Sequence, residues 1–359
     1  MTKQQLLDRV FDPKLRLFLS ADLVGSTAFK SALRSQPAAG GPIRLEDKAP
    51  FWLKPISRFF IDIEKWFMHE WLLASDKNEI KFDPGPAPET WKTLGDEILF
   101  VKDLTDPYQG WLAVAAMMRA LKKFRERGRN SGIDLVAQGA AWLAGFPISN
   151  SEIAFSAMPQ QNEGEIDPHI SSLLLNYRRL LRYYEAKEAD PLAANPILRD
   201  FVGPSIDCGF RLANKSTPER FMLSAELTWL LGKTESHHKS PFSKFPLRYG
   251  GLKSMRGVIA GRPYPVYWLE TMMGDDFATA EDELLNPHGA RNWDLVTKHA
   301  GYFIDREKSL HHPHVAGNSA GFNQMPEHLK LAVRQLRDTF IRENDLFESG
   351  QRDLATRKP

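Results

Sequence analysis

Residues 15–27 read LRLFLSADLVGST, and this stretch decides the fold. It opens with a short apolar run of β-forming side chains, which carries Asp22 near its end and stops at Gly25, Ser26 and Thr27. An apolar run that ends at such residues is typical of a buried strand that passes into a turn and then a helix. The sequence therefore predicts a first strand close to the start of the chain.

The segments after this strand alternate between helical and extended patterns. A stretch rich in Pro, Gly and Ala predicts a loop or insertion, and a tight hairpin corner is predicted at Leu94-Gly95-Asp96. The β, α, β, β, α, β order predicts an α/β (α+β) fold in which helices flank a mainly antiparallel sheet. The predicted elements are a strand over 15–24, a loop over 35–50, a helix over 56–73, extended segments over 79–82 and 90–104, a helix over 111–127 and a strand over 133–144.

The second half of the chain predicts elaborations of this core. A polar stretch is followed by a helix that carries several tyrosines and arginines, and the chain ends in a further helix. The predicted elements are a loop over 150–167, helices over 170–188, 202–211, 225–231 and 327–347, and strands over 221–223 and 264–269. We predict a main domain with insertions over 13–270 and a helical extension over 271–359.

Composition and charge narrow the classes of partner. The chain has 359 residues, of which 42% are hydrophobic and 11% aromatic, enough for a folded core. Its 47 basic and 45 acidic side chains leave a formal net charge of +2, which gives no reason to expect nucleic acid or an acidic membrane surface as the main partner. No apolar stretch is long enough to predict a membrane span.

Cysteine content and the N-terminal sequence bear on location. The start of the chain lacks a basic segment followed by an apolar core and a cleavage site, so no secretory signal is predicted. The single cysteine, Cys208, cannot form an internal disulfide, which fits a reducing compartment. We therefore expect a cytoplasmic protein in which Cys208 is a buried and inert thiol.

Two motifs place carboxylates where they could share metal ions. Asp22 stands at the end of a strand, just ahead of a Gly-led turn whose backbone N–H groups can meet phosphate oxygens. The segment KTLGD, residues 92–96, puts Asp96 on a hairpin corner. If the strands that carry these motifs are neighbours, Asp22 and Asp96 can share two hard cations, for which magnesium or manganese is suitable.

These motifs resemble the signatures of class III adenylate and guanylate cyclases. Residues 22–27 are similar to the family's Asp-x-x-Gly-[Phe/Ser]-Thr, and residues 92–96 to its Lys-Thr-[Ile/Leu]-Gly-Asp. The segment DFVGPSIDCGFRL, residues 200–212, resembles Asp-x-x-Gly-x-x-Val-Asn-x-x-x-Arg, and residues 253–267 resemble the closing strand of the family. The resemblance covers about residues 13–270 and implies a sandwich with a ferredoxin-like βαββαβ core.

The resemblance implies roles for the first two motifs. Asp22 and Asp96 would hold two manganese or magnesium ions, and the backbone carbonyl of Leu23 would add a ligand. The β- and γ-phosphates of a nucleoside triphosphate would lie against the turn that follows. That turn consists of Val24, Gly25, Ser26 and Thr27.

Three further residues receive catalytic or phosphate-binding roles by the same resemblance. Arg211 would neutralise the charge that grows on the phosphorus during displacement. Asp207 stands where the family usually has an asparagine that binds the ribose ring oxygen, and a carboxylate only accepts hydrogen bonds unless it is protonated. Arg256 replaces a triphosphate-binding lysine, which keeps the positive charge and changes the donor geometry.

Lys92 and Asp200 match the two positions that read the base in these cyclases. Both are the adenylate-type residues, so guanine is disfavoured. A lysine donor beside an aspartate acceptor also suits cytosine, and it suits uracil if lysine meets O4 while aspartate accepts from N3–H. The pair therefore leaves adenine, cytosine and uracil open.

The layout of the chain resembles the pyrimidine cyclases of bacterial Pycsar antiphage defence. The shared features are a long insertion after the first motif, an added tyrosine-rich helix and an extra C-terminal helix. The resemblance implies a homodimer with composite sites, in which the metal aspartates of one protomer work with Lys92, Asp200 and Arg211 of the other. It also implies a cyclic nucleotide that activates a separate effector.

The motifs and the resemblance together favour a nucleotidyl cyclase that converts UTP to cUMP and pyrophosphate, with CTP as the second choice and ATP as the third. The alternative from another class is an inactive cyclase-like module that senses nucleotides or binds a partner protein. The intact Asp22 and Asp96 argue against this alternative, and the departure at Asp207 argues weakly for it. A third alternative is a polymerase-like or diguanylate-type enzyme, which also binds metal ions through carboxylates. Such an enzyme needs a Gly-Gly-acidic hairpin tip, and Leu94-Gly95-Asp96 matches that poorly.

Overall fold

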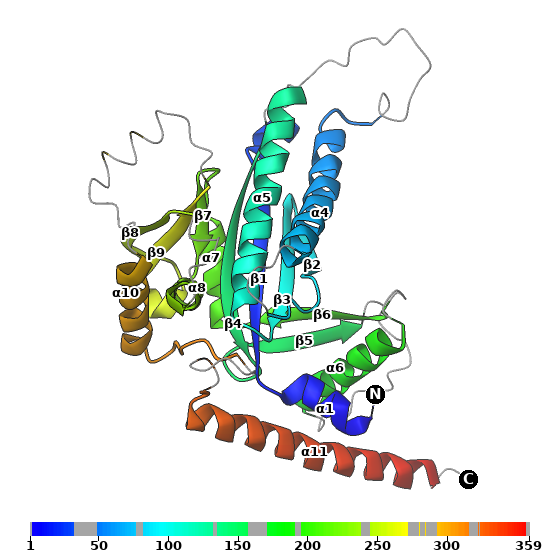
Figure 1. The fold of residues 1–359 in the computed structure, drawn as a ribbon. Helices are drawn as coiled ribbons and strands as arrows, with labels where there is room; N and C mark the ends of the chain where they lie inside the picture. Colours follow the sequence, from blue (N-terminus) through cyan, green and yellow to red (C-terminus); the bar gives the residue numbers. More distant parts are fainter. Residues whose placement is uncertain are drawn as a thin grey trace. The chain divides into compact units, whose positions relative to one another are not determined.

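The computed structural model divides the chain into two compact units (Figure 1). The sheet unit comprises Leu15–Leu143 and Asp207–Phe322, and the terminal unit comprises Met1–Lys14, Ala144–Ile206 and Asn323–Pro359. The structure describes residues 2–31, 49–76, 82–131, 135–156, 171–190, 195–237, 245–271, 280, 284, 293–315, 322 and 324–356.

A seven-stranded sheet forms the centre of the sheet unit, in the order β2-β3-β1-β4-β7-β9-β8. Neighbouring strands are antiparallel in the pairs β1–β3, β2–β3, β7–β9 and β8–β9, and parallel in β4–β7. The strands are β1 Lys14–Val24, β2 Glu89–Leu94, β3 Glu97–Leu104, β4 Val136–Phe146, β7 Arg220–Leu223, β8 Leu247–Ser254 and β9 Pro263–Glu270.

Two long helices, α4 (Leu53–Asp76) and α5 (Tyr108–Ser131), pack against each other and against one face of this sheet, which we call the α4/α5 face (Figure 1). Phe67 of α4 meets Phe100 of β3 with ring centroids 4.8 Å apart. The alternate residues of β1 that start at Leu15 point to the same core. The other helical segments of the sheet unit are α2 Ser26–Ser31, α7 Pro204–Ala213, α8 Ala225–His237, the 3₁₀ turn Val258–Gly261 and α10 Trp293–Arg306.

An aromatic cluster lies on the opposite face of the sheet, which we call the α7 face. Phe18 of β1 stacks on Trp142 of β4 with ring centroids 5.6 Å apart, and it meets the edge of Trp91 of β2 at 5.2 Å. Phe210 of α7 lies 5.7 Å from the Trp142 ring. Because Phe18 and Trp142 are fully buried, β1 has no solvent-exposed face over this stretch, and its sequence is accordingly an almost continuous apolar run.

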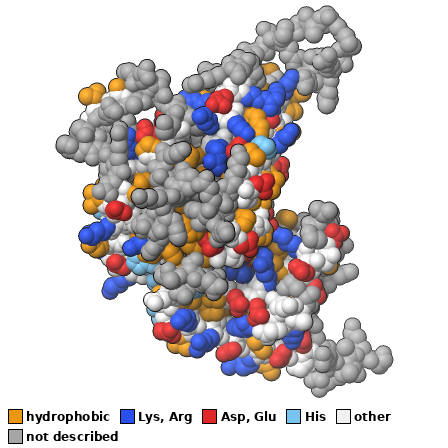
Figure 2. Space-filling model, in the orientation of Figure 1, with side chains coloured by type: hydrophobic (Ala, Val, Ile, Leu, Met, Phe, Trp, Pro, Cys, Tyr) orange, Lys and Arg blue, Asp and Glu red, His pale blue; other side chains and the backbone are white. Residues whose placement is uncertain are grey.

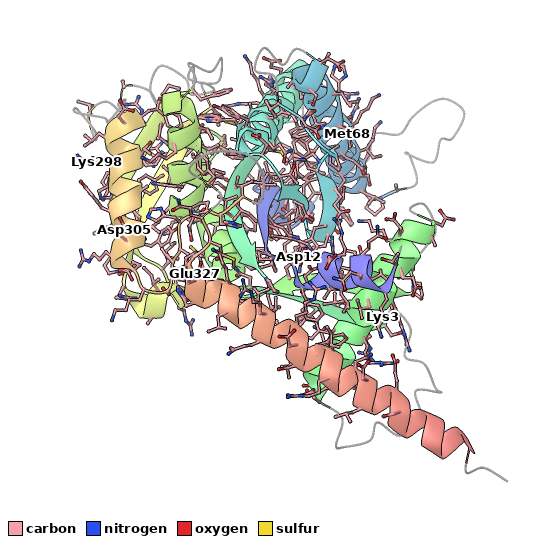
Figure 3. The ribbon with its side chains drawn as sticks, turned by 60° about the horizontal axis from the view of Figure 1, so that its bottom comes forward. Lys3, Asp12, Met68, Lys298, Asp305 and Glu327 are labelled. Atoms are coloured by element: carbon pink, nitrogen blue, oxygen red, sulfur yellow. The ribbon has the colours of Figure 1, made fainter. Side chains whose placement is uncertain are left out.

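The terminal unit packs three helices and a two-stranded antiparallel sheet around a small core of its own. Phe11, Tyr177 and Phe340 form its centre, with ring centroids of neighbouring pairs 4.9 to 5.9 Å apart. The long C-terminal helix begins at Glu327, which Figure 3 labels. The elements are α1 Lys3–Phe11, β5 Ser151–Ser156, α6 Ser172–Ala189, β6 Ile197–Val202 and α11 Glu327–Thr356.

The predicted α+β architecture with a mainly antiparallel sheet is confirmed, and the order from β1 to β4 reproduces the βαββαβ core. The predicted loop over 150–167 is wrong at its start, where β5 forms, and residues 157–170 lie outside the described residues. Residues 35–48 and 79–81 of the predicted loop and extended segment also lie outside them. The elements that the sequence did not predict are α1, β5, β6, β8 and α10.

The predicted boundary between a catalytic domain over 13–270 and an extension over 271–359 stays a prediction. Within the extension, α10 belongs to the sheet unit and α11 to the terminal unit. None of the helices in the described parts of the chain combines the length and the hydropathy that a membrane span requires. Basic and acidic side chains are interspersed on the face drawn in Figure 2.

The close approach of β4 to β1 gives a test of the packing. A Cβ atom on Gly139 would lie 2.7 Å from the backbone oxygen of Ser20 and 2.8 Å from the Phe221 ring. We expect Gly139→Ala to lower the free energy of unfolding by about 1–3 kcal/mol, because backbone and packed rings must shift. Gly145→Ala in the same strand is the control, since a Cβ there meets nothing within 4 Å. Urea unfolding of both variants measures the difference, and equal midpoints would contradict the tight β1–β4 approach.

Candidate functional site

The end of β1 passes into α2 through a single glycine. Val24 closes the strand, and Gly25 takes the left-handed backbone conformation with φ +73°. Asp22, two residues before the end of the strand, is half-buried, and its Oδ2 accepts a hydrogen bond of 3.0 Å from Nε2 of Gln138 in β4. The turn leaves the side chains of Val24 and Thr27 exposed, whereas Ser26 is buried.

The hairpin between β2 and β3 holds the second carboxylate. Gly95 turns the corner with φ +66°, a conformation that favours glycine, and Asp96 follows it directly before β3. The side chain of Asp96 is half-buried, while those of Thr93 and Leu94 are exposed. The corner thus presents one carboxylate next to two antiparallel strands.

The structure brings these two carboxylates together. The Ser26 hydroxyl donates a hydrogen bond to Oδ2 of Asp96, and Nζ of Lys30 lies 3.6 Å from its Oδ1. In the β1–β3 ladder, Asp22 faces Glu97, the residue after Asp96. Burial raises the pKa of Asp22, and the negative charge of Asp96 raises it further, whereas the hydrogen bond from Gln138 lowers it.

The donors at this end of the sheet suit a hard divalent cation. Asp22 and Asp96 offer carboxylate oxygens, and Leu23, the residue after Asp22, offers a backbone carbonyl. Magnesium is commonly held by one or two carboxylates together with substrate phosphates, so a pair of aspartates is a sufficient protein contribution. Among the described residues, no group of three or more His, Cys, Asp or Glu side chains forms a ready-made metal cage.

Glu97 is a third acidic residue at this place, and its role was not predicted from the sequence. One of its carboxylate oxygens, Oε1, is buried and accepts no hydrogen bond from the described residues. Burial raises the pKa of Glu97 to about 7, with smaller contributions from the charges of Asp22 and Asp96, while Ser20 and Lys92 act in the opposite direction. The signal in the sequence was its position directly after Asp96 in the apolar strand.

The two predicted base-reading residues belong to different units. Lys92 lies in β2 of the sheet unit, where its Nζ is 4.2 Å from the centroid of the Trp91 ring. Asp200 lies in β6 of the terminal unit, opposite Ile153 of β5, and its Oδ1 accepts a hydrogen bond of 2.9 Å from the backbone N–H of Phe201. Their predicted action as a pair stays a prediction.

α7 carries the predicted catalytic pair. Asp207 and Arg211 are one helical turn apart, and both are exposed. The helix packs closely on the sheet because Gly209 lacks a side chain: a Cβ there would lie 2.2 Å from the Trp142 ring. Cys208, which lies between Asp207 and Arg211 in the sequence, is buried, and burial raises the pKa of its thiol, as expected for an inert cysteine.

Arg211 and Arg256 lie together in the sheet unit. Nε of Arg211 donates a hydrogen bond of 3.2 Å to the backbone carbonyl of Arg256. Arg256 is exposed and precedes Gly257, which has φ +78°. The bond fixes the Arg211 side chain to the backbone at Arg256, and a guanidinium group can bind an oxyanion such as a phosphate group.

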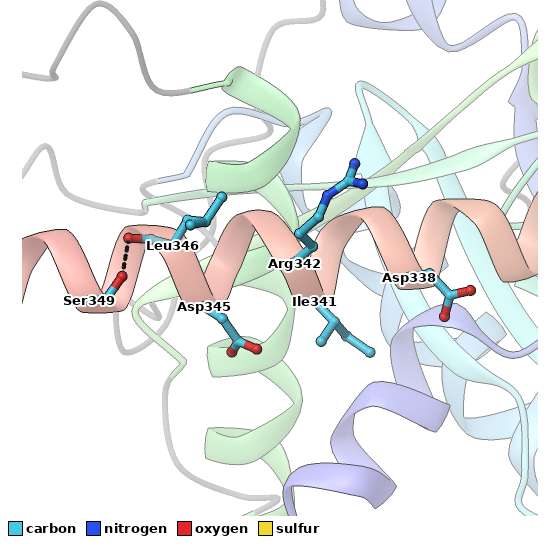
Figure 4. Close-up of a pocket in the computed structure, with 6 residues that line it drawn as sticks. All are labelled: Asp338, Ile341, Arg342, Asp345, Leu346 and Ser349. Carbon is cyan, nitrogen blue, oxygen red and sulfur yellow. Dashed lines mark hydrogen bonds between the residues drawn. The ribbon is translucent and has the colours of Figure 1, made fainter.

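A separate surface pocket lies on α11 of the terminal unit (Figure 4). All the residues that line it come from this one helix, and Ser349 donates a hydrogen bond of 2.8 Å to the backbone carbonyl of Leu346. It contains none of the predicted site residues. Its lining residues are Asp338, Ile341, Arg342, Asp345, Leu346 and Ser349.

The sequence matches no protein-family model and no curated protein. Among solved structures, the chain is similar to the adenylyl cyclase CyaB from P. aeruginosa, with 13% identity, 72% of this chain and 94% of that chain covered, and a TM-score of 0.43. It is similar to the guanylate cyclase domain of RhGC from Catenaria anguillulae in complex with GTP, with 10% identity, 71% and 96% covered, and a TM-score of 0.41. It is also similar to the guanylyl cyclase Cya2, with 13% identity, 75% and 97% covered, and a TM-score of 0.41.

Glu97 gives a pH-dependent test of the site in the metal-free protein. Its pKa is about 7 in the folded state against 4.5 as the ordinary value, so the folded state binds more protons between these two values. The free energy of unfolding therefore falls as pH rises from about 4.5 to about 7, and Glu97→Gln should remove about 1–2 kcal/mol of this fall.

Urea unfolding in EDTA at several pH values measures the effect. Glu64→Gln, at an exposed position of α4, is the control and should keep the wild-type pH dependence. Parallel stability curves for wild type and Glu97→Gln across this range would contradict the burial of Glu97 beside Asp22 and Asp96.

Proposed function

We propose that this chain is a nucleotidyl cyclase that converts a nucleoside triphosphate into a 3′,5′-cyclic nucleotide and pyrophosphate. The observation that carries the proposal is the meeting of Asp22 and Asp96 at the end of β1, next to a Gly-led turn. A pair of carboxylates beside such a turn is suited to metal-bound phosphates, and the sequences that form both parts resemble the signatures of class III cyclases.

The residues of the chain divide the work in this proposal. Asp22, Asp96 and the carbonyl of Leu23 would hold two magnesium or manganese ions, which would supply Lewis-acid chemistry to the 3′-hydroxyl and to the leaving pyrophosphate. The turn of Val24, Gly25, Ser26 and Thr27 meets the β- and γ-phosphates with its backbone N–H groups. When the turn binds the phosphates, the hydroxyl of Ser26 has two possible roles. It either leaves Asp96 and donates to a phosphate oxygen, or it keeps its hydrogen bond to Asp96 and orients that carboxylate.

The positive charge for the displacement comes from α7 and from the segment before the 3₁₀ turn. Arg211 neutralises charge on the phosphorus as the 3′-oxygen attacks, and Arg256 binds the triphosphate. The hydrogen bond between Arg211 and Arg256 supports a shared role at one phosphate group. Asp207, one turn before Arg211 on the same exposed side, is the ribose contact of this proposal.

A pyrimidine is the proposed base, with UTP ahead of CTP and ATP third. Lys92 donates to an acceptor on the base, and Asp200 accepts from an N–H group beside it. The half-buried position of Lys92 next to the Trp91 and Phe210 rings gives the donor an apolar surround in which the hydrogen bond is stronger than in water. The cyclic product would then act as a messenger in antiphage defence and switch on a separate effector.

The proposed active form is a homodimer with composite sites. Asp22 and Asp96 of one protomer would face Lys92, Asp200 and Arg211 of the other, so that each dimer holds two sites related by a two-fold axis. Within the sheet unit the contacts of Asp96 are to Ser26 and Lys30, whereas Arg211 is bonded to Arg256. In the proposed dimer, the group of residues around Asp96 in one protomer would meet the group around Arg211 in the other.

The activity is tested by incubation of the purified chain with Mn²⁺ and each of ATP, GTP, CTP and UTP in turn, with the products identified by mass. A cyclic pyrimidine nucleotide is expected. Asp22→Ala and Asp96→Ala should each lower the rate by at least about 100-fold, because each removes a ligand of the ions. Asp338→Asn on α11 is the control and should keep the rate. Cyclic AMP would replace the pyrimidine assignment, and no product from any nucleotide would favour a nucleotide-sensing module.

The composite site is tested by mixing two inactive variants. Asp22→Ala and Arg211→Ala carry their defects in different halves, so a mixed dimer has one site with both defects and one intact site. Random exchange of protomers should therefore restore about a quarter of the wild-type activity. A mixture that stays inactive, under conditions in which labelled protomers are seen to exchange, would contradict the composite arrangement.

A further inference from the structure

A β-bulge lies at Trp91, in the strand that carries Lys92. In the ladder between β2 and β3, Thr90 is opposite Phe100 and Lys92 is opposite Leu99, so the register shifts by one residue at Trp91. Bulges of this kind bend a strand and change the direction of the side chains that follow.

The bulge decides which face of the sheet receives Lys92. Thr90 shares the face of Phe100, which packs on Phe67 in the α4/α5 core. In a regular ladder without the bulge, Trp91 would be opposite Leu99, and strict alternation would put Lys92 opposite Ile98 on this covered face. With it, Lys92 lies on the face of Leu99 and Glu97, which is the α7 face that also carries Asp22.

The Trp91 ring then holds the lysine in place. Nζ of Lys92 is 4.2 Å from the centroid of this ring, within the distance of a cation–π contact. The ring itself is fixed on two sides, because it meets Phe18 of β1 at 5.2 Å and Phe210 of α7 at 6.1 Å. The long side chain of Lys92 is thus held over a rigid aromatic surface.

Acidic residues lie on the same face as Lys92. In the β2–β3 ladder, Lys92 is opposite Leu99 and Leu94 is opposite Glu97, so Glu97 lies on the face of Lys92, two residues along β3 from its partner. Glu97 in turn stands opposite Asp22 in the β1–β3 ladder. The ammonium group therefore lies over the aromatic cluster, on the face that carries these acidic residues.

We infer that Trp91 is a positioning residue for base selection: the bulge turns Lys92 to the α7 face, and the ring holds its ammonium where a base must present an acceptor atom. This inference rests on the proposed function, since it assigns Lys92 to the base. Loss of the ring lets the lysine adopt other rotamers, from which it meets acceptors at several positions and distinguishes bases less well.

The test separates base recognition from turnover. The probes are the 3′-deoxy forms of UTP, CTP, ATP and GTP, which cannot cyclise because they lack the attacking hydroxyl, and their affinities are measured by calorimetry with Mn²⁺. In Trp91→Leu, the ratio of affinities between the best and the second-best base should fall by about 3- to 30-fold. Trp91→Phe keeps an aromatic face and should restore most of the ratio, while the affinity for Mn²⁺ alone stays within about twofold in both variants.

Trp66→Leu is the matched control. Trp66 of α4 is also half-buried and also has a cation over its ring, with the Arg127 guanidinium carbon 5.6 Å from the centroid. Its replacement should lower stability and leave the ratio between bases unchanged. A ratio that Trp91→Leu leaves unchanged, or that Trp66→Leu changes equally, overturns the inference.

The outcome also distinguishes this inference from the proposed function. Selective binding that depends on Trp91, without any cyclic product from the natural triphosphates, leaves the inference standing and refutes the cyclase. Cyclic product together with a base preference that is independent of Trp91 supports the cyclase and refutes the inference. A wild-type protein that binds every base equally overturns the inference as well.

Discussion

The carboxylates of Asp22, Asp96 and Glu97 share one end of the α7 face, and their mutual repulsion is the constraint on which the arrangement depends. Like charges at this spacing disfavour the folded state unless a cation or protons compensate them. The β1–β3 ladder nevertheless holds Asp22 opposite Glu97 in a continuous register that begins at Leu15. A slip of one residue would turn Asp22 toward the α4/α5 core, so the apolar packing of both faces of β1 is what keeps the charges together.

Much of the fold follows from local sequence patterns. The apolar run of β1, the helical spacing of α4 and α5 and the Gly95 corner each predict their own element, because each pattern is produced by burial or turn geometry within a few residues. Short strands such as β5 and β6 escaped prediction because their polar residues, such as Glu152 and Arg199, are buried as an ion pair against Tyr184, and this pairing is not visible in the sequence.

The candidate site was predicted in part, for a related reason. Motifs locate Asp22 and Asp96, since strand ends and hairpin corners are local features. The hydrogen bond from Arg211 to the carbonyl of Arg256 joins residues that are distant in sequence, and the face on which Lys92 lies depends on one inserted residue in a ladder. Residues 144–206 belong to the same unit as the two terminal segments of the chain. This grouping likewise depends on long-range packing, which hydrophobic periodicity along the sequence does not predict.

The hydrogen bond at Nε of Arg211 has a consequence for binding entropy. A free arginine side chain has about 2 kcal/mol of rotamer entropy to lose when it is fixed. Anchoring of Nε to the Arg256 carbonyl removes part of this freedom before any ligand arrives, while the two terminal nitrogens of the guanidinium remain the fork that meets oxyanions. An anion that reaches this exposed arginine therefore meets a group whose orientation the backbone has already selected.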